Sequence, residues 1–99
     1  MSAYAIPLPP GADPGHVDDW EIVDGCPIRM VWSEKPNGLS EDLAPRAVCA
    51  QLGDGRVTVE NDPPEVYFAD TSMSADDARK VAAALIEVAD LADLWAGQR

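Results

Sequence analysis

Two short apolar runs with strand character, at residues 20–23 and 28–33, begin the patterned part of the chain. They flank Asp24-Gly25, a pair favoured in tight hairpin turns, so the pattern predicts two paired antiparallel strands. Side chains alternate between the two faces of a strand. The apolar positions on one face of the second run are Ile28, Met30 and Trp32. We therefore interpret Trp32 as a core residue.

A Gly-Asp-Gly sequence gives the clearest turn signal in the chain. It separates residues 46–52 from residues 56–60, in which valines alternate with polar side chains. Asp54-Gly55 suits the positive φ angles of a type I′ turn, so a hairpin is expected here. Prolines then end the pairing because they have no N–H to donate. A last strand is predicted at residues 65–69.

Residues 75–95 carry a long helical pattern. Ser74 is the expected N-cap, because its hydroxyl can accept a hydrogen bond from the N–H of Asp77. Apolar residues recur at spacings of three and four, which gathers them on one stripe. The stripe contains Ala78, Val81, Ala82, Leu85, Val88, Ala89 and Ala92. Such small side chains let a helix lie close to a sheet, so we expect this stripe to cover one sheet face.

Residues 1–19 contain four prolines and two glycines, with no period of either 2 or 3.6 residues. We predict an extended N-terminal arm that forms neither strand nor helix. Residues 20–99 are expected to form a single α+β domain. Its predicted architecture is an antiparallel sheet of about four or five short strands, packed against one C-terminal helix.

The surface of the protein is expected to be negatively charged, because the chain has 18 Asp and Glu residues but only 7 Lys and Arg, for a net charge of −11. Such a surface repels phosphates, so direct nucleic-acid binding is not expected. The same field steers a basic partner toward the protein, or simply keeps a small domain soluble. Neither a membrane-spanning apolar run nor a signal-peptide pattern occurs, so a cytoplasmic protein is expected.

The residues that usually carry chemistry show no catalytic or metal-binding spacing. The single histidine, His16, lies in the proline-rich arm, and Cys26 and Cys49 lack the close spacing of zinc ligands. No glycine-rich nucleotide loop occurs. We therefore expect no enzyme activity, no cofactor and no metal, and we expect both cysteines to be reduced.

Leu91, Leu94 and Trp95 are the candidate interface residues, because they lie partly off the main helical stripe. A second apolar strip on a surface helix often marks an interface. A second copy of the chain in a two-fold homodimer, or another protein, would cover it. Packing of the N-terminal arm over the strip explains it equally well.

Strands around a Gly-Asp-Gly turn, followed by the Ala-rich segment SADDARKVAAAL from Ser74 to Leu85, give the chain a recognisable ending. It resembles small uncharacterised proteins of high-GC actinobacteria and their phages. The resemblance covers roughly the second half of the chain. It implies an actinobacterial or bacteriophage source, with residence in the host cytoplasm if phage-encoded. It carries over no catalytic or binding residue.

The absence of catalytic patterns favours a non-enzymatic protein–protein interaction module, an accessory protein of a phage or an actinobacterium. The acidity supports an alternative, an inhibitor that mimics DNA phosphates and blocks a nucleic-acid-binding protein. A small enzyme or metal-binding protein is the third hypothesis.

Overall fold

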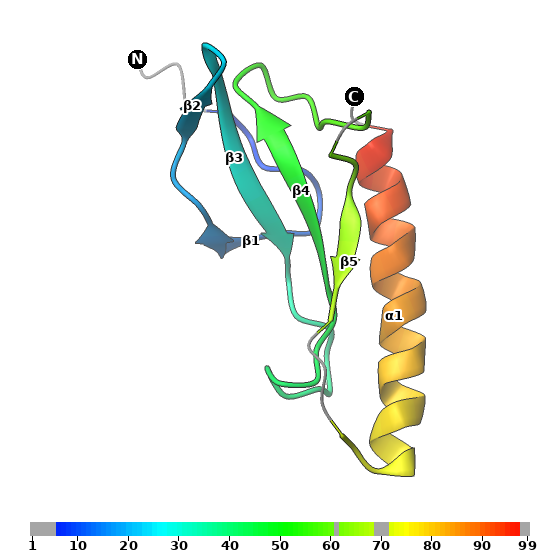
Figure 1. Cartoon of the computed structure of the whole chain (residues 1–99). Coiled ribbons are helices and arrows are strands. Elements are labelled where there is room, and N and C mark those ends of the chain that lie inside the picture. The colour runs from blue at the N-terminus through cyan, green and yellow to red at the C-terminus, as the bar shows by residue number, and fades with distance from the viewer. Residues whose placement is uncertain (1–5, 61, 69–71, 98–99) are drawn as a thin grey trace.

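A computed structural model describes residues 6–60, 62–68 and 72–97 of the chain. Five strands form one antiparallel sheet with a long helix against one of its faces, so the predicted α+β class is confirmed (Figure 1). The elements are β1 (Ala12–Val17), β2 (Glu21–Val23), β3 (Cys26–Ser33), β4 (Arg46–Leu52), β5 (Glu65–Tyr67) and α1 (Ala75–Ala96). The order across the sheet is β1-β3-β4-β5. Both β1 and β2 pair with the same edge of β3, β2 with its first residues and β1 with its last.

The hairpin of β2 and β3 turns at Asp24-Gly25, as predicted. Val23 pairs with Cys26, which leaves a two-residue loop. Asp24 and Gly25 both have positive φ angles, of 52° and 80°. This is the backbone that a type I′ turn requires, and its twist matches that of the strands it joins.

The chain also turns at Gly53-Asp54-Gly55, but the predicted type I′ geometry there is wrong. Only Gly55 has a positive φ angle, of 93°, and the N–H of Leu52 donates to the carbonyl of Arg56 across a three-residue loop. The predicted strand at residues 56–60 is also wrong, because only Val57 forms a bridge, to Gln51. The N–H of Thr58 still donates to the carbonyl of Ala50, but from Val48 backward the same edge of β4 pairs with β5, so the returning chain leaves this edge after Thr58.

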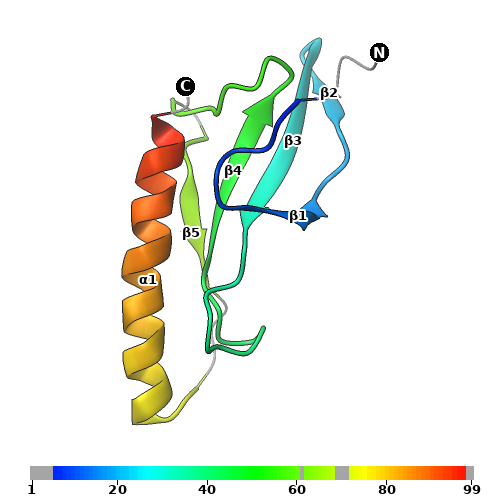
Figure 2. The same cartoon turned by 180° about the vertical axis from the view of Figure 1, so that it is seen from behind.

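The prediction that residues 1–19 contain no strand is wrong for β1. Ala12 pairs with Ser33 and Val17 with Val31, so four residues of β1 bulge out between two close positions of β3. Pro14 is tolerated because β1 lies at a sheet edge and the bulge removes the need for its missing N–H. Ahead of β1, the segment of residues 6–11 crosses the helix-side face of the sheet and turns at Pro10-Gly11 (Figure 2).

The helix begins and ends close to its predicted limits. The hydroxyl of Ser74 accepts a 3.1 Å hydrogen bond from the N–H of Asp77, as expected for the N-cap, and Gly97 is the C-cap. The buried stripe, however, consists of Val81, Ala84, Val88, Ala92 and Trp95. Of the predicted stripe, Ala78, Ala82 and Ala89 are exposed. Valine and tryptophan bury more apolar area than alanine, so they fix the rotation of the helix.

The main core lies between α1 and the sheet. It contains Val31, Ala47, Cys49, Val57, Val88, Ala92 and Trp95, and Leu8 from the N-terminal segment packs against it. Hydrogen bonds tether that segment, because the side chains of Arg29 and Gln51 donate to the carbonyls of Ile6 and Pro7 at 2.9 Å each. A second cluster of Leu39, Val81 and Ala84 closes the other end.

Candidate functional site

The structure places the three predicted interface residues in different environments. Trp95 is completely buried, and its indole N–H donates a 2.7 Å hydrogen bond to the carbonyl of Pro10. Leu91 is half-buried against Gly11, where an added Cβ would lie 3.0 Å from the leucine methyl carbons. Only Leu94 is substantially exposed, at 50%. The N-terminal segment therefore covers most of this strip, which was one of the two expected explanations.

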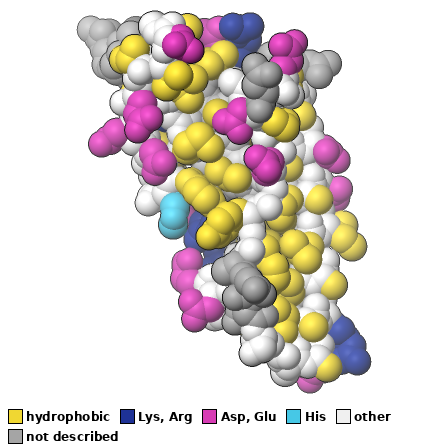
Figure 3. All heavy atoms as spheres, viewed as in Figure 1, with side chains coloured by type: hydrophobic (Ala, Val, Ile, Leu, Met, Phe, Trp, Pro, Cys, Tyr) yellow, Lys and Arg dark blue, Asp and Glu magenta, His cyan; other side chains and the backbone are white. Residues whose placement is uncertain are grey.

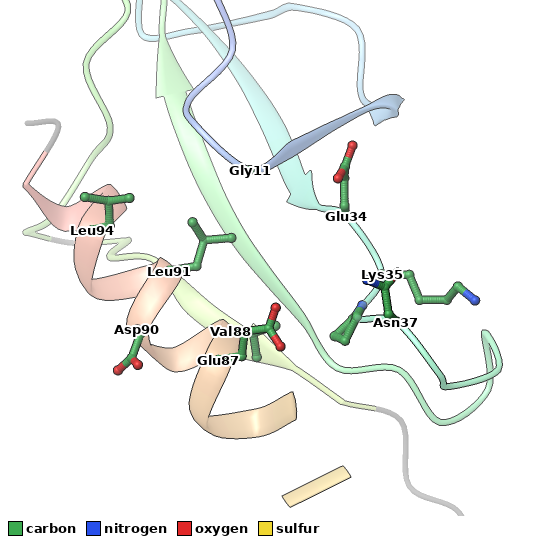
Figure 4. A pocket seen from close by; sticks show the side chains of 10 residues that line it. Gly11, Glu34, Lys35, Asn37, Glu87, Val88, Asp90, Leu91 and Leu94 are labelled. Atoms are coloured by element: carbon green, nitrogen blue, oxygen red, sulfur yellow. The ribbon is translucent and has the colours of Figure 1, made fainter. Parts of the chain in front are cut away.

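A cleft of about 460 Å³ remains between α1, Gly11 and the loop after β3 (Figure 4). Leu91 points toward Gly11 across this cleft. The amine of Lys35 points away from the helix and donates a 2.7 Å hydrogen bond to the carbonyl of Leu39. The cleft is lined by carboxylates, a lysine and apolar groups, with neither a cysteine nor a histidine among them. It therefore holds no catalytic pair built on a cysteine or a histidine.

A larger apolar surface lies on the side of the sheet opposite α1. Because Val31, Ala47 and Cys49 face the helix, strand alternation turns the neighbouring apolar side chains to the other side. Among the described residues no element covers that side. We call it the open face and define it by Val23, Ile28, Met30, Trp32, Val48, Leu52 and Tyr67. The interpretation of Trp32 as core is thus wrong, since the residue lies on the open face and is only partly buried.

The register of the strands aligns the open face into rows. Ile28 lies opposite Leu52, and Trp32 lies opposite Val48. The rings of Trp32 and Tyr67 meet edge to face, with centroids 5.3 Å apart, and form an aromatic platform at one end. Tyr67 is 56% exposed. Figure 3 views the molecule from this side and shows hydrophobic side chains running along it.

The other end of the open face is hollowed. A cavity of about 690 Å³ lies between the strands and residues 56–60, with Asp62 at its margin. Val23, Ile28 and Leu52 form its apolar lining. The returning chain after the Gly53-Asp54-Gly55 turn therefore forms one wall of a groove. Such a hollow can receive a large apolar side chain from outside the protein.

Carboxylates surround the open face. Glu21 lies opposite Ile28 and Glu65 opposite Val48, while Glu60 and Asp62 border the hollow. Within the described part of the chain, none of these four carboxylates lies in an ion pair with an Arg or Lys. Figure 3 shows Asp and Glu side chains around and between the hydrophobic ones.

The two arginines nearest the open face are already neutralised. Arg46 is buried and lies 3.3 Å from carboxylate oxygens of both Asp13 and Glu41. Arg56 pairs with Asp54 at 2.7 Å. The potential over the open face is therefore set by the unpaired carboxylates, in line with the net charge of the chain.

The histidine and the cysteines lie apart. His16 is exposed beside Trp32, with ring centroids 6.0 Å apart, whereas Cys26 is exposed at the start of β3. Cys49 is buried under α1, and burial, with a smaller contribution from Asp62, raises the pKa of its thiol to about 12. Over residues 6–60, 62–68 and 72–97, no three His, Cys, Asp or Glu side chains converge as a metal site would require.

The fold and this surface define a two-layer α+β protein in which one apolar sheet face carries no helix or strand from the described residues. No protein-family model, curated protein or solved structure matches the chain. In the described parts of the chain, no helix is both long and apolar enough to cross a membrane.

Proposed function

We propose that this chain is a non-enzymatic protein–protein interaction module that binds its partner through the open face. One observation supports this proposal above the others: both faces of the sheet are apolar, yet the described chain supplies a covering layer for only one. A sheet normally buries its apolar face against another layer. Contiguous apolar surface left open, especially when rimmed by polar groups, marks an interaction site.

The side chains of the open face suit this role. Trp32 and Tyr67 offer large, rigid rings, the residue types that most often dominate binding energy at interfaces. Covering a large apolar side chain contributes roughly 1.5–3 kcal/mol, so a few such contacts offset the entropy cost of association. Leu94 lies on α1, away from this surface, and contributes at most a separate contact.

Affinity capture with matched variants tests the proposal. Val23 and Tyr67 are exposed, at 45% and 56%, so replacing both by serine removes open-face contacts with little effect on folding. Ile86→Ser is the control, because Ile86 is 67% exposed on α1. Wild type and control should retain the same partner from a lysate of the source cells, and the double variant should lose it.

Salt separates this function from the DNA-mimic alternative. An apolar interface keeps its partner as salt increases, whereas binding of a DNA mimic to a basic protein collapses. Retention of the same partner by the Val23→Ser/Tyr67→Ser variant would refute the proposal. Salt-sensitive capture of a nucleic-acid-binding protein that is indifferent to this variant would favour the mimic.

A further inference from the structure

We infer that the occupant of the open face is a cationic amphipathic helix of another protein. This inference rests on the proposed function and specifies the chemistry of its partner. The helix lies along β3 and β4 with its apolar side on the open face. Its Lys and Arg side chains reach the acidic rim of Glu21, Glu60, Asp62 and Glu65.

The dimensions of the open face suit a helix. Neighbouring strands are about 4.8 Å apart, so three strands present a surface roughly as wide as the ~10 Å diameter of a helix. At about 3.3 Å per residue, the eight residues of β3 span a length that four to five helical turns would cover. On the other face of the sheet, α1 packs against β4 and β5 (Figure 1). The complex would be a three-layer α/β/α arrangement.

Charge selects a basic partner over a second copy of the chain. A second copy brings the same unpaired Glu21, Glu60 and Glu65, together with the same net charge of −11. Its nearest cations, Arg46 and Arg56, are held by their own carboxylates. Face-to-face pairing would therefore bring the carboxylates of the two rims together, and their repulsion disfavours a dimer. A helix with Lys and Arg beside its apolar stripe meets each carboxylate with an opposite charge.

The two ends of the open face give the helix distinct contacts. The hollow lined by Val23, Ile28 and Leu52, at about 690 Å³, is large enough for a large aliphatic or aromatic side chain. At the other end, the exposed ring of Tyr67 and the neighbouring Trp32 offer faces on which an Arg or Lys can stack. Both contacts require apolar and cationic groups on one helix.

Three synthetic peptides test the inference on the full chain. The first is a helix with leucines along one side and lysines elsewhere, the second has glutamates in place of the lysines, and the third is a scrambled form of the first. Methyl NMR of the labelled protein locates binding at Ile28, Val48 and Leu52. We expect the lysine peptide to shift these signals and the glutamate peptide to bind at least about tenfold more weakly. The scrambled peptide should leave the open-face signals unchanged.

Charge variants add a matched control. The double variant Glu21→Gln/Glu65→Gln should bind the lysine peptide several-fold more weakly, and this binding should depend less on salt. Glu87→Gln with Asp93→Asn removes the same charge from α1 and should leave affinity nearly unchanged. Equal effects of the two pairs would overturn the inference, because the attraction would then be that of net charge alone.

The outcomes separate this inference from the proposed function. Equal binding of lysine and glutamate peptides at the open face would overturn the basic partner and keep the interaction surface. A wild-type dimer in sedimentation that Val23→Ser/Tyr67→Ser dissociates would do the same, with a second copy as occupant. If no peptide shifts the open-face signals and the chain is a monomer, the inference is wrong, and the capture experiment alone decides the proposed function.

Discussion

The indole N–H of Trp95 donates a 2.7 Å hydrogen bond to the carbonyl oxygen of Pro10, across 85 positions of sequence. The ring is completely buried, and Leu8 and Leu91 pack against the same cluster. The segment before β1 is therefore part of the core. It positions the end of α1 and keeps most of the predicted apolar strip away from solvent.

We predict that Trp95→Ala lowers the free energy of unfolding by about 3–5 kcal/mol, because it leaves a large cavity in the core. Trp95→Phe should cost less, about 0.5–1.5 kcal/mol from the lost hydrogen bond to Pro10, in addition to any loss of packing. Urea denaturation followed by circular dichroism measures both. Leu94→Ala is the control, with an expected loss below about 1 kcal/mol. Equal losses at the two positions would contradict the buried role of Trp95.

The Asp24-Gly25 turn should depend on backbone conformation alone. Gly25 has a φ of +80°, and a Cβ added there would meet no atom within 4 Å. Gly25→Ala should therefore cost roughly 1 kcal/mol through its left-handed backbone, without a clash. Gly15→Ala is the control, because the φ of Gly15 is not positive and the added Cβ makes only an ordinary contact. Chemical denaturation that ranks Gly15→Ala as the more damaging change would refute this assignment.

The two cysteines should differ sharply in reactivity. Cys26 is exposed, whereas Cys49 is buried with a thiol pKa raised to about 12, chiefly by desolvation. Because the thiolate is the reactive species, a disulfide reagent at mildly alkaline pH should modify Cys26 quickly and Cys49 only as the protein unfolds. Mass spectrometry of the labelled peptides assigns the sites. Denatured protein without reductant should show two reactive thiols, and equal rates in the native state would contradict the burial of Cys49.

Strand β4 could be predicted to the residue because both its ends are marked in sequence. Pro45 precedes it and the Gly53-Asp54-Gly55 turn follows it. The covered face could not be predicted in the same way, because both sides of β3 and β4 are apolar. The larger side chains on the side that carries Trp32 suggested that this side was the core. The smaller side chains of Ala47 and Cys49 instead allow α1 to approach closely.

The candidate interface was harder to predict because its environment depends on distant residues. Nothing near Trp95 in sequence indicates that Pro10 accepts its hydrogen bond. The strand character of β1 was hidden by Pro14, which only an edge position with a bulge tolerates. The alternation of Ile28, Met30 and Trp32 did carry the signal for the open face, but it was interpreted as core.

Acid should weaken the contact between β1 and β4 through Asp13. The pKa of this carboxyl lies below its usual 3.8, chiefly because the backbone N–H of Gly15 donates a hydrogen bond to it. Desolvation opposes this shift, and the neighbouring Arg46 adds to it. A lowered folded pKa contributes stability above pH 3.8 that is lost as the pH falls toward the folded value. Asp54 has a lowered pKa for a similar reason, with Arg56 as its partner.

We therefore predict that Asp13→Asn lowers thermal stability at neutral pH and makes the loss of stability below pH 3.8 shallower than in wild type. Asp54→Asn should do the same independently, because the two carboxyls share no partner and their effects should add in the double variant. Midpoints of thermal unfolding, measured across the acid range, test both. Arg46→Met should also reduce the part of the pH dependence of stability that comes from Asp13. At neutral pH it should lower stability more than Asp13→Asn does, because the buried carbonyl of Ser33 loses its 2.6 Å hydrogen bond. An Asp13→Asn profile parallel to that of wild type would show that the carboxyl titrates alike in the folded and unfolded chains.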